Sequence, residues 1–247
     1  MILKNLSITN YKNIEASQFN FNSSINCFVG DNGIGKSNVI DSIYHLAFGK
    51  SYFNPSSIEN IKFKKDFFII QGDFKNADRK EKIICSFKKG FKKIVKRNEK
   101  NYNKISDHIG LIPLVIVSPI DQDLIIEGSA TRRKFIDGII GQTDKIYLQN
   151  ILNYNKILSQ RNALLKYFAV NHKFNEETLN AYSFQLSKLA KPIFEKRSSF
   201  LEKFTPFFLE SYRKISGSNE SVSIRYKSDL KEKTSLELFA ENLEKDR

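Results

Sequence analysis

The residues best suited to chemistry in this sequence form one short glycine-rich segment, GDNGIGKS. Its spacing fits G-x-x-x-x-G-K-[ST], a pattern in which backbone N–H groups surround a phosphate chain and glycines allow close approach. The lysine would reach the β- and γ-phosphates, and the serine hydroxyl would bind Mg²⁺, a hard cation that prefers oxygen ligands. We therefore predict a site for ATP and Mg²⁺ made by Gly30, Asp31, Asn32, Gly33, Ile34, Gly35, Lys36 and Ser37.

The flanking residues predict a strand before this segment and a helix after it. Ile25, Cys27 and Val29 alternate with polar residues, as in a strand that ends at Gly30. Apolar residues from 39 to 47 recur at helical spacing, and Gly49 stands where a helix C′ residue belongs. The helix N-terminus would add its positive dipole end to the phosphate site.

The rest of the first half predicts further strands. Residues 2–8 alternate as an opening strand, and residues 67–97 alternate as antiparallel strands with a turn at Lys89-Gly90. Residues 113–118, PLVIVS, form a continuous apolar run that predicts a central strand covered on both faces. Cys27 and Cys85 are expected to be buried, reduced thiols.

The second half predicts helices. Residues 129–214 have helical spacing, with Asn175 as the N-cap of a second long arm and with Pro192 and Pro206 kinking or interrupting it. Residues 221–226 return to alternation, and Ser235 is expected to cap a final short helix. That helix has no glycine stop and no strand after it, so we expect a chain that lacks its C-terminal part. The predicted domains are residues 1–125 and 126–247.

The sequence identifies no catalytic residue. Phosphoryl transfer needs a carboxylate near Mg²⁺ and a group that orients water. Asp121 follows a proline turn and Asp73 follows a glycine, so neither ends an apolar strand in the usual way.

The positive charge is local. The formal net charge is +13, and residues 62–104 hold 15 Lys or Arg against 5 Asp or Glu, a net +10. A basic β face suits contact with a DNA backbone, without a base code, and the candidates are Lys88, Lys89, Lys92, Lys93, Lys96 and Arg97. The alternative is a solvated edge whose lysines suppress aggregation.

No targeting or membrane segment is expected. The N-terminus lacks the apolar core of a signal peptide, and the apolar run 109–120 is too short to span a bilayer. We expect a cytoplasmic protein with no membrane partner. The His and Cys residues never approach the spacing of metal ligands.

Several segments resemble the RecF family of bacterial DNA replication and repair ATPases, which are related to SMC proteins. They are LSITNYKNIE, VGDNGIGKSNVIDSIYHLAFGKSYF, SPIDQDLIIEGSATRRKFIDGIIGQ and YNKILSQRNALLK. The likeness covers nearly the whole chain, and the EGSATRRKFID block and QRNALLK are its specific parts. One departure is Ala130, where family members often have proline.

The resemblance implies an α/β, ABC-type P-loop ATPase head with a mixed sheet and a helical second lobe. It places Lys12, Asn13 and Asn38 near the nucleotide, and it favours a structural or inter-lobe role for Arg132 and Arg133. The family's signature motif and acidic pair are absent from this sequence. The complete protein would form an ATP-dependent homodimer, bind gapped, double-stranded and single-stranded DNA, act in the SOS response and work with RecR- and RecO-type proteins.

Two other readings stay open. The chain could be a nucleotide-binding P-loop fragment without catalytic activity of its own. It could also be an unrelated P-loop kinase, although the RRKFID block argues against that reading.

Overall fold

The structure, a computed structural model, describes residues 1–76, 79–217 and 220–246. It divides into two compact units, Met1–Gln122 and Asp123–Arg247, and each is described by itself. The division predicted from the sequence, after residue 125, differs from this one by three residues.

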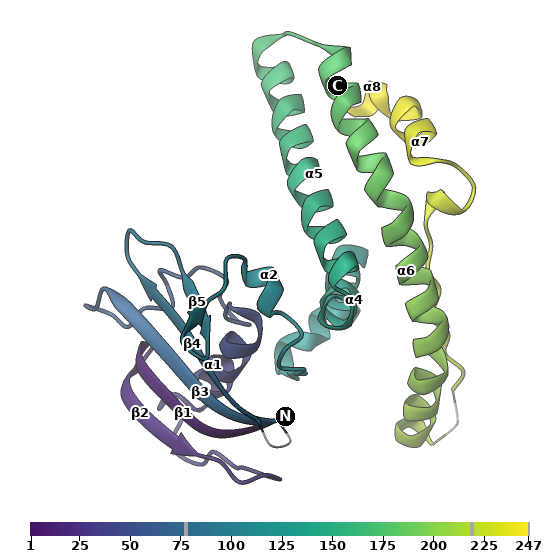
Figure 1. Ribbon diagram of the computed structural model, residues 1–247. Coiled ribbons are helices and arrows are strands. Elements are labelled where there is room, and N and C mark those ends of the chain that lie inside the picture. Colours follow the sequence, from purple (N-terminus) through teal and green to yellow (C-terminus); the bar gives the residue numbers. More distant parts are fainter. Residues whose placement is uncertain (77–78, 218–219, 247) are drawn as a thin grey trace. The chain divides into compact units, whose positions relative to one another are not determined.

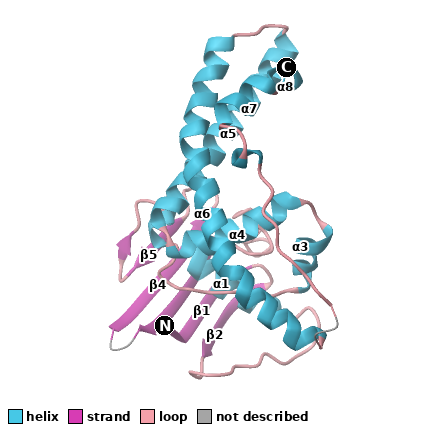
Figure 2. Ribbon diagram, turned by 90° about the vertical axis from the view of Figure 1, so that its right-hand side faces the viewer, coloured by secondary structure: helices cyan, strands magenta, loops and turns pink. Residues whose placement is uncertain are grey.

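The first unit is built on one sheet, whose strands lie side by side in Figure 2. The strand order is β2-β1-β3-β4-β5-β6. Every pairing between the described strands is antiparallel. The predicted opening strand and the antiparallel strands after residue 67 are confirmed. The strands are β1 (Ile2–Tyr11), β2 (Ile14–Asn20), β3 (Phe67–Asn76), β4 (Arg79–Lys88), β5 (Ile94–Arg97) and β6 (Lys100–Asn101).

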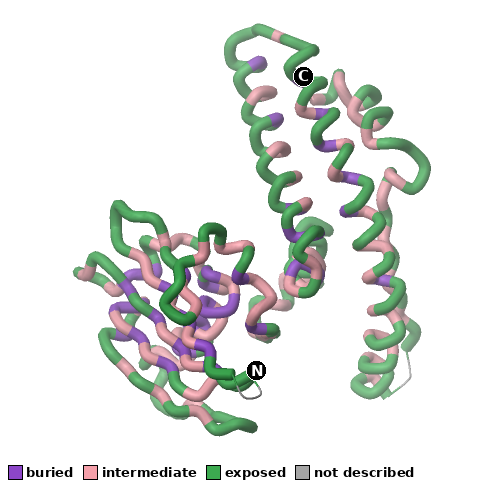
Figure 3. The backbone as a smooth tube through the Cα atoms, in the orientation of Figure 1, coloured by how far each residue is buried: buried purple, intermediate pink, exposed green. Residues whose placement is uncertain are grey.

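Helix α1 (Lys36–Phe48) packs on one face of this sheet, and the core lies between them. Figure 3 shows buried residues concentrated on the strands and on α1. The helix approaches closely because β3 carries Gly72, where an added Cβ would lie 2.6 Å from Leu46 Cδ1. Burial of each large aliphatic side chain here stabilises the unit by about 1.5–3 kcal/mol, and the fully buried ones include Leu6, Ile8, Leu46, Ile70 and Ile83. Gly49 ends α1 in the left-handed conformation, as predicted.

Two predicted strands are not formed. The segment before the glycine loop is not a strand, and Ile25 and Val29 are 82% and 93% exposed. Cys27 is exposed rather than buried, whereas Cys85 is buried as expected. Residues 113–118 are also not a strand, and Val115 and Val117 are exposed. Apolar alternation makes a strand only where another strand can satisfy its N–H and C=O groups, and none of the described residues pairs with either segment.

The other helical segments of the first unit are short. They are α2 (Ile105–His108) and the 3₁₀ turn η1 (Pro119–Gln122). The second unit contains α3 (Asp123–Ile126), α4 (Ser129–Thr143), α5 (Lys145–Asn171), α6 (Glu176–Ser216), η2 (Asp229–Lys231), α7 (Ser235–Glu241) and α8 (Leu243–Asp246).

The second unit is organised by a helical hairpin in which α5 and α6 run side by side (Figure 1). Asn175 caps α6, as predicted, since its side chain accepts a hydrogen bond from the Thr178 N–H. The N-terminus of α5 is capped in the same way by Asp144, which accepts from the Tyr147 N–H at 2.9 Å. These caps satisfy backbone donors that helices leave free at their first turn.

Three predictions for this unit are wrong in detail. Helix α6 continues through Pro192 and Pro206, so the predicted interruption does not occur, and the kink stays a prediction. The carbonyls that lose a donor belong to Lys188 and Glu202, which are exposed residues, so water can replace the lost donor. Residues 221–226 are not a strand. The cap of α7 is Thr234 rather than Ser235, because the Thr234 side chain and Glu237 form a reciprocal capping box.

Candidate nucleotide-binding site

The glycine loop adopts backbone conformations that require glycine. Gly33 and Gly35 have φ values of 83° and 114°, a region that other residues rarely adopt. Gly35 also lies against a neighbour, since an added Cβ would be 2.7 Å from the Asn13 side-chain oxygen. The loop leads directly into α1, whose first residue is Lys36.

Lys36 lies across this loop. Its Nζ donates hydrogen bonds to the carbonyl oxygens of Gly30 and Asp31, at 2.7 and 2.8 Å. Both acceptors are neutral, so a phosphate oxygen, which is charged, would be a stronger acceptor for the same ammonium group. The side chain is half-buried, and Asp31, Asn32, Gly33 and Ile34 are exposed, so the loop is open to a ligand.

Ser37 presents its hydroxyl in the exposed first turn of α1. A hydroxyl oxygen is a suitable ligand for Mg²⁺, and the positive end of the helix dipole favours an anion beside it. The donor set of the loop therefore fits a phosphate chain with a hard cation.

The turn between β1 and β2 is joined to the glycine loop and to α1 by side-chain hydrogen bonds. Asn13 Nδ2 donates to the Gly33 carbonyl at 2.8 Å, and Asn38 Nδ2 donates to Asn13 Oδ1 at 2.8 Å. The structure thus brings Asn13 and Asn38 together with the glycine loop, and their place near a nucleotide stays a prediction. Asn13 therefore uses both its side-chain nitrogen and its side-chain oxygen in hydrogen bonds to other residues of the protein.

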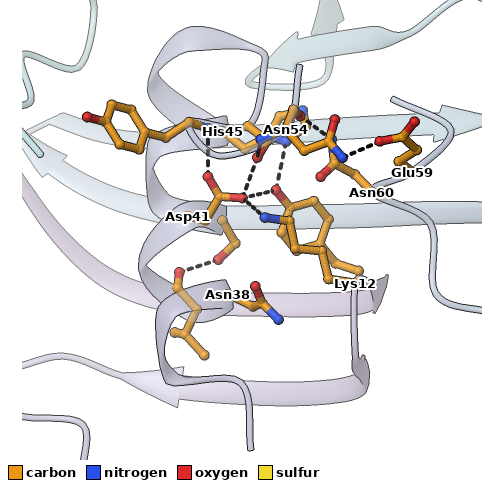
Figure 4. Close-up of polar contacts among 12 residues, drawn as sticks. Lys12, Asn38, Asp41, His45, Asn54, Glu59 and Asn60 are labelled. Carbon is orange, nitrogen blue, oxygen red and sulfur yellow. Dashed lines mark hydrogen bonds and ion pairs between the residues drawn. The ribbon is translucent and has the colours of Figure 1, made fainter. Parts of the chain in front are cut away.

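Lys12 points elsewhere. Its Nζ lies 2.6 Å from Asp41 Oδ2 (Figure 4), and its side chain is only 15% exposed. The structure therefore gives this lysine a carboxylate partner on α1.

Asp41 is a residue that sequence reasoning missed. It is fully buried, and besides Lys12 its carboxylate accepts hydrogen bonds from the Tyr11 hydroxyl, the Ser51 hydroxyl and the Tyr52 N–H, at 2.6, 2.7 and 2.7 Å. Burial raises the pKa of Asp41, but hydrogen bonds from Lys12, Ser51 and Tyr11 outweigh burial and hold this pKa below its usual value. A signal existed in the sequence, since an aspartate interrupts the apolar spacing of the predicted helix.

His45 extends this cluster by one helical turn. Its Nδ1 lies 3.2 Å from the Tyr11 hydroxyl oxygen, and the ring is fully buried. Burial, assisted by the nearby charge of Lys93, lowers the pKa of His45 to about 3. The imidazole is therefore neutral at physiological pH, and Asp41 keeps its negative charge.

The two carboxylates considered for hydrolysis lie apart from this site. Asp121 accepts hydrogen bonds from the Ser118 N–H and the Tyr52 hydroxyl, at 2.6 and 2.5 Å. Asp73 alternates with the buried Phe74 on β3 and so lies on the sheet face away from the core. In the described part of the chain, neither carboxylate contacts residues 30–37, and no group of three or more His, Cys, Asp or Glu is placed to hold a metal ion.

The six basic residues predicted to contact DNA do not form one surface. Lys93 Nζ donates to the Gly49 carbonyl at 2.7 Å, and burial lowers the pKa of Lys93. Arg97 forms a two-bond ion pair with the buried Glu81. Lys93 is therefore held inside the unit, and Arg97, although 40% exposed, is paired with a buried carboxylate. Lys89 is exposed and lies 3.2 Å from Asp66, and Lys92 is exposed.

Strand register gathers a different set of lysines. Lys88 and Lys96 alternate with buried residues of β4 and β5, so they lie on the sheet face opposite α1. Three lysines that the sequence did not single out share that face, because β4 and β3 continue the alternation. This set, called the lysine face below, is Lys75, Lys80, Lys82, Lys88 and Lys96.

In the second unit, Arg132 and Arg133 contact their own segment. Arg132 Nη1 donates to the carbonyls of Leu124 and Glu127, at 2.9 and 3.0 Å, and Arg133 Nη1 donates to the Ser129 hydroxyl. These bonds join α3 to the start of α4.

The glycine loop at the N-terminus of a helix packed on a β-sheet defines a P-loop nucleotide-binding unit. Comparison with protein families agrees, since the AAA domain family matches residues 5–246. The chain is 56% identical over its whole length to the DNA replication and repair protein RecF of Flavobacterium johnsoniae, and 43% identical to that of Phocaeicola vulgatus. The chain belongs to the RecF family.

The solved structures agree with this assignment. The chain matches a structure described as the recombination mediator protein RecF-ATP in the RecFOR pathway, with a TM-score of 0.87 and 28% identity over 99% of this chain and 68% of the other. A second, described as RecF-ATPrS, gives a TM-score of 0.85 and 31% identity over 98% of this chain and 66% of the other. The predicted fold, a P-loop ATPase head of the RecF type, is confirmed.

The chain spans about two thirds of its curated relatives, 69% of the Flavobacterium johnsoniae protein and 66% of the Phocaeicola vulgatus protein. Within the described residues, no helix combines the length and the apolarity that crossing a membrane requires.

Proposed function

We propose that this chain binds ATP with Mg²⁺ at its glycine loop, as the nucleotide-binding part of a DNA repair protein. The observation that carries the proposal is the geometry of Lys36, whose ammonium lies across a loop held open by positive-φ glycines. On binding, Lys36 would exchange its two carbonyl acceptors for β- and γ-phosphate oxygens. Ser37 would bind Mg²⁺, which would take its other ligands from phosphate and water.

The proposal extends to DNA. The relatives are named DNA replication and repair proteins, and the lysine face offers positive charge to a phosphate backbone. The complete protein would act in recombinational repair at gapped or single-strand/double-strand DNA and in the SOS response. It would form an ATP-dependent homodimer and work with RecR- and RecO-type proteins in the cytoplasm.

Hydrolysis by this chain alone would be negligible. Its 247 residues contain no S-x-G-Q segment, and Asp41, on the helix that follows the loop, already accepts hydrogen bonds from four groups. The ATP site would therefore hold the nucleotide without turning it over rapidly.

The test is MgATP binding measured by calorimetry. Lys36→Ala should weaken binding at least about tenfold, because charge-assisted hydrogen bonds contribute about 1.5–3 kcal/mol. The control is Lys166→Ala, which removes the same charge from an exposed position on α5. Equal affinity of Lys36→Ala and the wild type would contradict the site.

A further inference from the structure

We propose that Lys12 is a positioning residue rather than a phosphate ligand. Through its ion pair with Asp41 it holds the turn between β1 and β2, and Asn13 on that turn supports the glycine loop. The inference rests on the proposed nucleotide site and names what sets the shape of its loop. It departs from the direct role near the phosphates that the family resemblance implies for Lys12.

The charge of Lys12 is already neutralised within the protein. Its Nζ lies 2.6 Å from the carboxylate of Asp41, which is fully buried. Aromatic rings of Tyr11 and Phe53 lie 5.6 and 5.3 Å from the same ammonium group, within the range of cation–π attraction. To bind a phosphate instead, Lys12 would leave a buried carboxylate without its cation, which is strongly unfavourable.

The turn between β1 and β2 depends on contacts from outside it, because two of its residues are left-handed. Asn10 and Lys12 have φ values of 51° and 52°, and a left-handed conformation costs a residue with a Cβ roughly 1–2 kcal/mol. Such conformations persist where surrounding contacts determine them. Here the Lys12 N–H donates to the Asn60 carbonyl at 2.9 Å, and Lys62 Nζ donates to the Asn13 carbonyl at 2.8 Å. The ion pair ties this turn to α1 at Lys12 itself, beside the hydrogen bonds that join Tyr11 to Asp41 and Asn13 to Asn38.

The turn contacts the glycine loop directly. Asn13 donates to the Gly33 carbonyl, accepts from Asn38 and occupies the space that a side chain at residue 35 would need. A shift of the turn would therefore move Asn13 away from two residues of the loop. Figure 4 shows Lys12 and Asp41 facing each other, with Asn38 on the same helix as Asp41.

The two roles of Lys12 predict opposite results for Asp41→Asn. If Lys12 positions the turn, loss of the carboxylate charge loosens the turn and weakens nucleotide binding. If Lys12 is a phosphate ligand, the same substitution frees its ammonium for the phosphates, and binding stays the same or becomes tighter.

The experiment measures MgATP and MgADP affinity for Lys12→Met, Asp41→Asn, the double variant and Asn13→Ala, with Lys166→Met as the charge-matched control. We expect both single charge variants and Asn13→Ala to weaken ATP and ADP by the same factor, about fivefold to 30-fold. The double variant should bind no more weakly than Lys12→Met, because residues that act through one interaction are not additive. A larger loss for ATP than for ADP in Lys12→Met, or unchanged or tighter binding by Asp41→Asn, would overturn the proposal.

A second readout separates this inference from the proposed function, because it needs no nucleotide. Backbone amide resonances of Gly33 and Gly35 in the nucleotide-free protein should shift in Lys12→Met and in Asn13→Ala, and should not shift in Lys166→Met. Unshifted glycine resonances in Lys12→Met would overturn the positioning role whether or not the wild type binds ATP. If Asp41→Asn does not fold, Lys12→Met and Asn13→Ala decide the question, since the Asn13 side chain is exposed.

Discussion

At the scale of single residues, the first unit keeps an ionised carboxylate inside its core. A buried charge is tolerated only when it is paired and fully hydrogen-bonded. Asp41 meets this condition with an ammonium group, two hydroxyls and a backbone N–H. Because its folded-state pKa is lowered, Asp41 stabilises the fold above its unfolded pKa, and this contribution is lost as the pH falls through the folded value.

His45 gives a prediction for the pH dependence of stability. Its pKa falls from 6.5 to about 3 on folding, so below pH 6.5 the unfolded chain binds a proton that the folded chain does not. The free energy of unfolding should therefore decrease as the pH falls, by about 2 kcal/mol between pH 8 and pH 5 from this group. Urea unfolding at the two pH values measures the loss.

The variant that isolates this effect is His45→Asn, which removes the titrating ring from its place beside Asp41, Lys12 and Lys93. Its stability should depend less on pH than that of the wild type. His172→Asn is the matched control, because His172 is exposed and asparagine tolerates its φ of 49°. An unchanged pH dependence in His45→Asn would contradict the prediction.

The residues of the loop were predictable from the sequence because their chemistry is local. Gly33, Gly35, Lys36 and Ser37 are fixed by the spacing of one segment. The partner of Lys12 was not predictable, because Asp41 lies 29 residues further along the chain and meets it only when α1 packs on the sheet. Contacts of this kind depend on tertiary structure, and no local pattern encodes them.

At the scale of elements, helix ends were easier to predict than strand pairing. A cap is decided by a few neighbouring residues, and Gly49 and Asn175 both act as predicted. A strand is decided by another strand. Residues 113–118 carry the apolar run of a central strand, yet no described segment pairs with them. The lysine face also depends on strand pairing, because the register of β4 with β3 and β5 brings lysines of three strands together.

The helices of the second unit give a prediction about stability. Arg197 on α6 forms two hydrogen bonds to Asp137 on α4, at 2.8 and 2.7 Å, and the Tyr147 hydroxyl of α5 donates to the same carboxylate. Arg197→Met should lower the free energy of unfolding by about 3–5 kcal/mol, because it leaves a largely buried carboxylate without its cation. Urea denaturation, followed by the loss of helical circular dichroism signal, measures this change in the free energy of unfolding.

Lys191→Met is the control for Arg197→Met, since Lys191 lies on the same helix in an exposed pair 3.9 Å from Glu195. Exposed pairs of this kind contribute little. Replacing Asp137 as well, in Arg197→Met/Asp137→Leu, should recover much of the loss because no buried charge remains. Equal stability of Arg197→Met and Lys191→Met would contradict the role of this ion pair.

At the scale of the whole molecule, the positive charge is concentrated in one segment of the chain. The excess sits within residues 62–104, and strand register places five of its lysines on the lysine face. In the described residues that face carries one strand carboxylate, Asp73, and no ion pair joins it to Lys82 beside it. A surface of this kind attracts a polyanion, and its contribution to binding depends on salt.

The lysine face predicts a measurable change in the salt dependence of DNA binding. Each phosphate contact contributes about 0.9 to the slope of log affinity against log salt for duplex DNA, and about 0.7 for single strands. The triple variant Lys80→Gln/Lys82→Gln/Lys96→Gln should therefore lower the duplex slope by about 2 to 3, with the loss of affinity greatest at low salt. The control, Lys166→Gln/Lys188→Gln/Lys191→Gln, removes the same charge from exposed positions of α5 and α6 and should leave the slope close to wild type. Equal lowering of the slope by both triple variants would contradict a contact at the lysine face. It would mean that long-range attraction by the total net charge drives the binding.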